Sequence, residues 1–253
     1  MTISCDVTGD GPALVLLHSG VCDRRMWDAQ RPDLVDAGFR VVRCDFRGFG
    51  QTPPADRPYS NADDVLTLLD SLGIERAALV GASYGGQVAL EVAALRPGLV
   101  ERLVLVCSAL PGHEPSDELE ALDERENALL DAGDVAGAVE LMVDTWLGPD
   151  ADQSARAAVR EMQRLAFDVQ LAADDVDSLE AEVEVDLTEV RAPCLALSGR
   201  HDLADFREIA AQLPAVLADA RHVELPWAGH LPSLERPSEF TALLVDWLRG
   251  AAR

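Results

Sequence analysis

The sequence predicts an α/β protein in which helices cover both faces of a mostly parallel sheet. One observation is a series of short apolar runs, rich in Val and Leu, as expected of strands buried on both faces. A second is that these runs alternate with segments whose apolar residues recur at helical spacing. Such alternation favours parallel strands joined by helices.

Six apolar runs are predicted to be strands, and a turn at residues 8–12 predicts an antiparallel strand before the first of them. The runs span residues 13–19, 40–46, 77–83, 102–109, 193–199 and 221–226. Helices are predicted at about residues 28–36, 60–72, 84–95, 204–216 and 236–250.

One long stretch contains helical patterns and no strand-like run. We therefore predict an α/β core formed by residues 1–112 and 191–253, and a helical lid formed by residues 113–190 over the C-terminal edge of the sheet. An acidic stretch at residues 173–186 lacks the central glycine and final glutamate of an EF-hand calcium loop. It is predicted to be a solvated helix face or loop.

The composition is typical of a globular protein, since 48% of the 253 residues are hydrophobic. The chain starts without the basic and apolar regions of a signal peptide, and no run of about 18 apolar residues predicts a membrane span. The five cysteines have no C-x-x-C spacing, which favours a reducing, cytoplasmic setting. We expect Cys44, Cys107 and Cys194 to be buried in strands.

The charged residues exclude several classes of function. All 21 basic residues are arginine, so a lysine Schiff base and a Walker A lysine are both excluded. The net charge is −24 and no basic patch is visible, so a nucleic-acid partner is not expected. A neutral or mildly polar small molecule is the expected substrate. Oligomeric state has no signature in this sequence.

The stretch "LVGASYGGQ" at residues 79–87 places Ser83 between Gly81 and Gly85 in a G-x-S-x-G pattern. A predicted strand precedes the serine and a predicted helix follows it. A tight turn between them requires small neighbours and lifts the hydroxyl clear of the sheet at a helix N-terminus. Ser83 is therefore predicted to be a nucleophile.

A serine nucleophile needs a base, and the base needs an orienting acid. Of the five histidines, His230 is the predicted base, because it lies in a loop after the last predicted strand. His18 ends the first apolar strand and is also expected near the site. Asp202 follows a strand end and is the predicted acid, with Asp205 as the alternative, although Asp205 could instead cap the following helix.

The tetrahedral intermediate needs two donors for its oxyanion. The backbone N–H of Tyr84 is predicted to be one donor, and that of Gly20, or of Val21 one residue along, is predicted to be the other. Cys22 lies near this loop, but no partner base is evident for it as a nucleophile. The residues predicted to bind substrate are Val21, Cys22, Trp146 and Leu231, with Trp146 alternatively part of the lid core.

Five motifs resemble the α/β-hydrolase superfamily, in that family's order. They are "LLHSG" (16–20), "DFRGFGQT" (45–52), "GASYGG" (81–86), "GRHD" (199–202) and "AGHLPSLERP" (228–237). The resemblance implies the α/β-hydrolase fold, with a mostly parallel sheet of about eight strands and a helical cap between the sixth and seventh. It also implies a site without a cofactor, and we assign no metal ligands.

The predicted function is cleavage of an ester, lactone or related acyl bond through an acyl-enzyme. Serine at the nucleophile position argues against the dehalogenases and epoxide hydrolases of the family, which use aspartate there. Gly20 stands where many relatives have a bulky residue, so a roomier acyl pocket is expected. The alternatives are a C–C bond hydrolase, a cofactor-free haloperoxidase or perhydrolase, and a ligand receptor or interaction module with little turnover.

Overall fold

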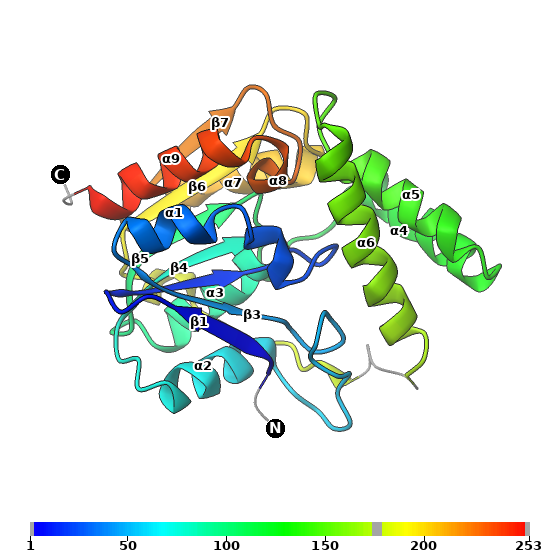
Figure 1. Ribbon diagram of the computed structural model, residues 1–253. Coiled ribbons are helices and arrows are strands. Elements are labelled where there is room, and N and C mark those ends of the chain that lie inside the picture. The colour runs from blue at the N-terminus through cyan, green and yellow to red at the C-terminus, as the bar shows by residue number, and fades with distance from the viewer. Residues whose placement is uncertain (1–2, 174–178, 251–253) are drawn as a thin grey trace.

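The computed structural model describes residues 3–173 and 179–250 and contains a seven-stranded sheet (Figure 1). The strand order is β1-β3-β2-β4-β5-β6-β7. The strands are β1 (Cys5–Thr8), β2 (Ala13–Leu17), β3 (Arg40–Cys44), β4 (Ala77–Ala82), β5 (Val100–Val106), β6 (Cys194–Gly199) and β7 (Ala220–Leu225). All six predicted runs and the opening strand are therefore confirmed, within a few residues at their ends.

Strand direction brings the predicted site residues to one edge of the sheet. β1 pairs antiparallel with β3, and every other pairing is parallel, as predicted. Leu17 pairs with Gly81, and Ala82 pairs with Val106, so the carboxyl ends of β2, β4 and β5 end at the same level. Loops that follow these strands lie next to one another, as is usual for ligand sites of open α/β sheets.

Helices cover both faces of the sheet, as the sequence predicted (Figure 1). α1 (Arg31–Asp36) and α9 (Pro237–Arg249) lie on one face, and α2 (Asn61–Ser71), α3 (Tyr84–Leu95) and α7 (Ala204–Val216) lie on the other. Residues alternate between the two apolar layers along each central strand: Leu79 belongs to the same apolar cluster as residues of α2 and α3, whereas Val80 belongs to the cluster that contains residues of α9. The sheet is buried on both faces, which explains its nearly continuous apolar runs.

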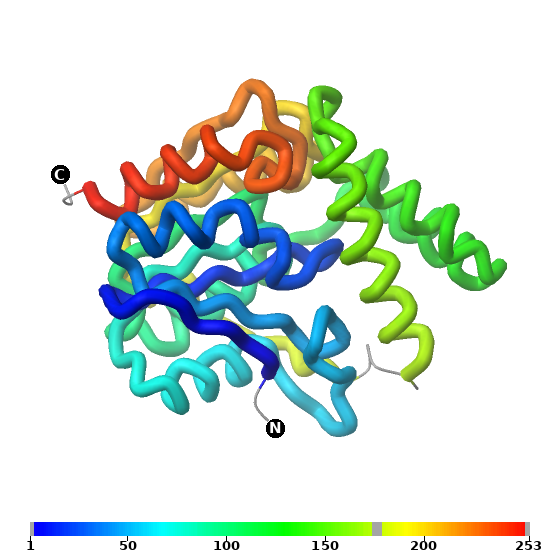
Figure 2. Tube along the Cα trace, in the orientation of Figure 1, coloured from blue at the N-terminus to red at the C-terminus, as the bar shows by residue number. Residues whose placement is uncertain are grey.

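In the described part of the chain between β5 and β6, three α-helices cover the carboxyl edge of the sheet (Figures 1 and 2). They are α4 (Asp117–Asp131), α5 (Val135–Trp146) and α6 (Gln153–Gln170). An arginine on α6, Arg160, bonds to Glu140 on α5. The boundaries of this block at residues 113 and 190, and its action as a lid, stay predictions.

Part of the acidic stretch at residues 173–186 lies outside the described residues, at positions 174–178. Residues 181–186 form neither helix nor strand, and Glu182 and Glu184 are exposed. The short helices η1 (Arg24–Trp27), η3 (Leu187–Glu189) and α8 (Pro232–Glu235) complete the described elements used below.

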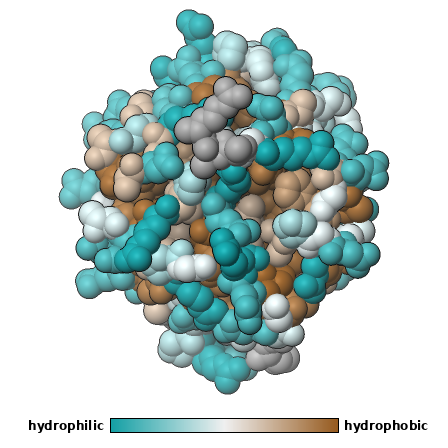
Figure 3. Space-filling view, turned by 90° about the vertical axis from the view of Figure 1, so that its left-hand side faces the viewer, coloured by the Kyte–Doolittle hydropathy of each residue, from teal (hydrophilic) through white to brown (hydrophobic). Residues whose placement is uncertain are grey.

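All five cysteines are free, and Cys44, Cys107 and Cys194 are buried as predicted, although Cys107 lies just beyond the end of β5 and not in a strand. Among the helices of the described residues, none combines the length and the apolar character needed to span a bilayer. Figure 3 views the face opposite α4–α6, where hydrophobic and hydrophilic side chains are interspersed. A groove of about 500 Å³ at the amino ends of the strands has Arg76, Glu101 and Arg102 in its lining.

α3 buries a carboxylate, Glu91, whose charge opposes folding. Its side chain is 5% exposed and accepts a hydrogen bond of 2.9 Å from Nε2 of Gln87. Burial and, to a smaller extent, the negative charge of Glu180 raise the pKa of Glu91 from 4.5 to about 6, although the hydrogen bond from Gln87 opposes the rise. Between pH 4.5 and 6 the folded protein binds more protons than the unfolded chain. The free energy of unfolding therefore falls as the pH rises through this range.

We expect Glu91→Gln to raise the free energy of unfolding by about 1–2 kcal/mol at pH 8, because no buried charge is then formed. At pH 4 the gain should vanish, since Glu91 of the native protein is then already neutral. Urea denaturation of both proteins at the two pH values measures the difference. A gain of equal size at both pH values would contradict this account.

Candidate active site

Ser83 occupies the turn between β4 and α3 with a backbone that L-residues rarely adopt. Its φ is 52° and its ψ is −118°. A Cβ on Gly85 would lie 2.5 Å from the carbonyl oxygen of His18, and a Cβ on Gly81 would overlap the Gly85 carbonyl. Glycine is therefore required on both sides of the serine. The strained conformation is held by the surrounding structure, as is common at functional sites.

His230 and Asp202 form a buried pair at the ends of β6 and β7. The imidazole Nδ1 lies 2.9 Å from Oδ1 and 2.8 Å from Oδ2 of Asp202. Oδ1 also accepts a hydrogen bond of 2.8 Å from the Leu203 amide. A carboxylate at Nδ1 favours a proton on that nitrogen, which leaves Nε2 as the acceptor required of a general base.

Aromatic rings fix the plane of the His230 imidazole. The rings of Trp146 and Phe206 pack against it with centroids 4.4 Å and 4.3 Å away. The His230 amide donates to the Trp146 carbonyl at 3.0 Å, so the end of α5 holds both the backbone and the ring of this residue. Trp146 is 7% exposed and supports the histidine directly.

His18, the other histidine expected near the site, has no nitrogen left for catalysis. Its Nε2 accepts a hydrogen bond from the Phe46 amide at 3.0 Å, and its Nδ1 bonds the Ser19 carbonyl at 2.8 Å. Burial lowers the pKa of His18, which keeps the ring neutral and maintains both bonds. His18 therefore fixes the loops after β2 and β3 to each other.

Asp205, the alternative acid, is fully engaged elsewhere. It accepts hydrogen bonds from the Ser116 amide at 2.9 Å and the Ser116 hydroxyl at 2.6 Å, and it bonds Nε2 of His113 at 2.9 Å. It lies inside the first turn of α7, whose N-cap is Leu203, so the suggested capping role is wrong. Asp205 instead joins the start of α4 to α7.

The end of β5 connects the serine turn to the Asp–His pair. The Ser83 amide donates to the Val106 carbonyl at 2.9 Å, and the Ala109 amide donates to the Ser83 carbonyl at 3.0 Å. Between them, Cys107 places Sγ 3.7 Å from the Gly229 carbonyl oxygen. Among the described residues, no hydrogen bond joins the Ser83 hydroxyl to His230; such contacts often tighten only with substrate bound.

The loop after β2 presents the predicted second oxyanion donor. A Cβ on Gly20 would lie 3.7 Å from Cβ of Tyr84, so these two residues face each other. In the described part of the chain, neither the Gly20 amide nor the Tyr84 amide donates a hydrogen bond. The Val21 amide donates a long hydrogen bond of 3.5 Å to the Ser19 hydroxyl. Gly20 therefore fits the predicted role better than Val21.

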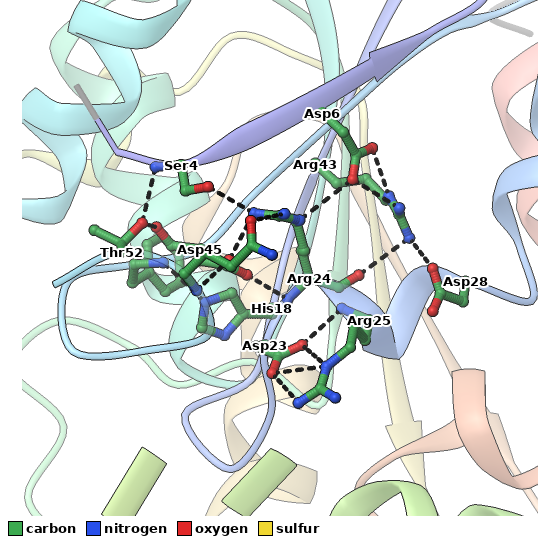
Figure 4. A network of polar contacts seen from close by, with 12 residues as sticks. Ser4, Asp6, His18, Asp23, Arg24, Arg25, Asp28, Arg43, Asp45 and Thr52 are labelled. Atoms are coloured by element: carbon green, nitrogen blue, oxygen red, sulfur yellow. Dashed lines mark hydrogen bonds and ion pairs between the residues drawn. The ribbon is translucent and has the colours of Figure 1, made fainter. Parts of the chain in front are cut away.

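A polar network fixes the loop after β2 to the residues that follow β3 (Figure 4). Asp45 accepts hydrogen bonds from the Arg24 amide at 2.8 Å, the Arg24 guanidinium at 2.7 Å and the Gln51 amide at 2.9 Å. Asp23 caps η1 through the Arg25 amide at 2.9 Å. Burial opposes its ionisation, but hydrogen bonds from Arg25 lower the pKa of Asp23 overall. The network gives the loop a defined shape.

The residues predicted to bind substrate differ in exposure. Cys22 and Leu231 are fully buried in the apolar layer, whereas Val21 is partly exposed. Burial raises the pKa of the Cys22 thiol far above its usual value, so this side chain is no nucleophile. Contact of these residues and Trp146 with substrate stays a prediction.

Glu235 is a supporting residue that the sequence did not single out. From α8, its carboxylate accepts hydrogen bonds from the Gly229 amide at 2.9 Å and 3.0 Å and from the Leu231 amide at 3.1 Å. These two amides flank His230. Burial raises the pKa of Glu235. A glutamate five residues after the histidine, inside "AGHLPSLERP", was the available signal, but nothing marked it as buried.

The mostly parallel sheet, the serine turn and the buried Asp–His pair together define a protein of the α/β-hydrolase class. Residues 14–243 match the Alpha/beta hydrolase family. The chain belongs to that family and is a hydrolase.

Three similar proteins carry hydrolase names. RutD of Pantoea ananatis, named for carbamate hydrolysis, is 30% identical over 247 residues, which cover 94% of this chain and 89% of that protein. The pimeloyl-[acyl-carrier protein] methyl ester esterase of Nitrosospira multiformis is 27% identical, covering 95% and 96% of the two chains. The crystal structure of the enol-lactonase of Burkholderia xenovorans LB400 superimposes with a TM-score of 0.81 at 28% identity, covering 98% and 96%.

We expect Glu235→Ala to lower the free energy of unfolding at pH 7 by about 2 kcal/mol, because two buried amides lose their acceptor. Glu239→Ala is the matched control: this glutamate bonds Arg236 on the surface at 3.3 Å, and its loss should cost about 0.5 kcal/mol or less. Urea denaturation measures both values. Equal losses in the two variants would show that Glu235 does not brace the loop.

Proposed function

We propose that this chain is a serine hydrolase that cleaves an ester, a lactone or a related acyl bond through an acyl-enzyme. The observation that carries the proposal is the buried bond from Nδ1 of His230 to Asp202, at the same sheet edge as Ser83 on its strained turn. An imidazole oriented in this way is the base that a serine hydroxyl requires.

In the first step, Oγ of Ser83 attacks the substrate carbonyl carbon while Nε2 of His230 takes the hydroxyl proton. Asp202 holds the Nδ1 proton and stabilises the imidazolium that forms. The carbonyl oxygen becomes an oxyanion, bound by the amides of Gly20 and Tyr84. When the tetrahedral intermediate collapses, the leaving oxygen takes the proton from His230 and the acyl group remains on Ser83.

In the second step, water replaces the leaving group. His230 takes one proton from the water as its oxygen attacks the acyl carbon, and the same two amides bind the second oxyanion. Collapse breaks the bond to Ser83, whose Oγ recovers the proton from His230. The products are a carboxylic acid and a free enzyme, and no cofactor is required.

Ester, lactone and carbamate cleavage all occur in the names of the relatives, and all proceed by attack on an acyl carbon. Gly20 has no side chain above the acyl group, which supports a substrate with a bulky or branched acyl part. We further propose that α4–α6 act as the lid, since Trp146 of α5 lies on His230. The proposed substrate is a small cytoplasmic molecule that carries no negative charge.

We expect purified Ser83→Ala to lose at least about 10³-fold in kcat/KM on short p-nitrophenyl esters, because the attacking oxygen is removed. Ser108→Ala is the matched control, since Ser108 lies at the end of the neighbouring strand and donates to the Ala109 carbonyl at 2.6 Å. It should keep most of the wild-type activity. Turnover by Ser83→Ala close to that of wild type would contradict the proposal.

A further inference from the structure

The side chain of Tyr84 leads from the serine turn to a polar cluster formed by Asn61, Tyr84 and Glu180. Its Cβ faces Gly20, and its ring meets the ring of Phe46 edge-on with centroids 5.5 Å apart. Its hydroxyl donates to the Glu180 carboxylate and accepts a hydrogen bond of 2.6 Å from Nδ2 of Asn61. One tyrosine side chain therefore separates the proposed oxyanion site from a carboxylate.

Glu180 is held in place through its backbone as well as its side chain. The Tyr59 amide donates to the Leu179 carbonyl at 3.0 Å, and the Ala181 amide donates to the Tyr59 carbonyl at 2.8 Å. The Glu180 carboxylate also accepts a hydrogen bond of 3.0 Å from Nδ2 of Asn61. The segment that returns from α6 to the core thus carries a positioned carboxylate.

The cluster presents a negative charge and hydrogen-bond acceptors. No ion pair within residues 3–173 and 179–250 involves Glu180. Burial and the Glu180 charge raise the pKa of Tyr84, which keeps its hydroxyl protonated. Oδ1 of Asn61 is buried and has no partner in the described part of the chain. An unpaired buried acceptor of this kind calls for a donor.

We propose that Glu180, held by Tyr84 and Asn61, forms a specificity subsite for a cationic or hydrogen-bond-donating substituent of the substrate. The subsite rests on the proposed function, because it lies one tyrosine side chain away from the oxyanion site which that function requires. A cation on the acyl chain is attracted by the carboxylate, and an anion is repelled. Glu180 is exposed to solvent, so screening limits the discrimination to about tenfold.

Three p-nitrophenyl esters whose acyl chains have similar lengths test the subsite. Their acids are the cationic 4-(trimethylammonio)butanoate, its neutral isostere 5,5-dimethylhexanoate, and the anionic glutarate. We expect the wild-type kcat/KM to be highest for the cationic ester and lowest for the anionic one. Glu180→Gln keeps the length of the side chain and removes its charge, so the ratio of kcat/KM for the cationic and anionic esters should fall about tenfold. This ratio is independent of the fraction of active protein.

Glu182→Gln is the matched control. It changes the net charge equally, two residues along the same exposed segment, and should leave the ratio unchanged. Raising NaCl from 0.05 to 0.5 M should lower the wild-type ratio without any substitution. An unchanged ratio in Glu180→Gln, an equal fall in Glu182→Gln, or a salt-independent wild-type ratio would each overturn the subsite. If none of the three esters were hydrolysed, both the proposed function and the subsite would be overturned.

Discussion

The parallel hydrogen bonding of β4, β5 and β6 is the constraint on which the site depends. Because Ala82 pairs with Val106, and Val106 with Leu197, the residues that follow these strands start from the same level. The register places the Ser83 turn beside the end of β5, and the end of β5 beside the loop that carries Asp202. A shift of one residue in either pairing would move each side chain of the strand to the opposite face of the sheet. It would also separate the proposed nucleophile from its acid.

The base has a different kind of support, because His230 lies in a loop and no strand fixes it. Its position comes from the Trp146 carbonyl, the two aromatic rings and the Glu235 carboxylate. These contacts come from α5, α7 and α8, so the block α4–α6 contributes to the site directly and not only as a cover. The same block returns to the core through Glu180, whose contact with Tyr84 joins it to the serine turn.

The fold could be predicted from the sequence, and Ser83, His230 and Asp202 could be proposed as site residues, because each depends on a local pattern. Apolar runs predicted the strands, and glycines around Ser83 predicted a turn so tight that the structure leaves no space for a Cβ on either side. Contacts between distant segments left no such pattern. Glu235, the hydrogen bonds that occupy His18 and Asp205, and the link from Glu180 to Tyr84 all depend on how loops pack, which periodicity does not encode.

The central claim is that His230 activates the Ser83 hydroxyl. Labelling with a fluorophosphonate tests it most directly, because the reagent reacts with an activated serine and its adduct can be located by intact-mass measurement and peptide mapping. The account predicts one adduct per chain, at Ser83, and labelling at least about 100-fold slower in His230→Ala. An adduct on another residue, no adduct at all, or equal labelling rates in the two proteins would contradict it.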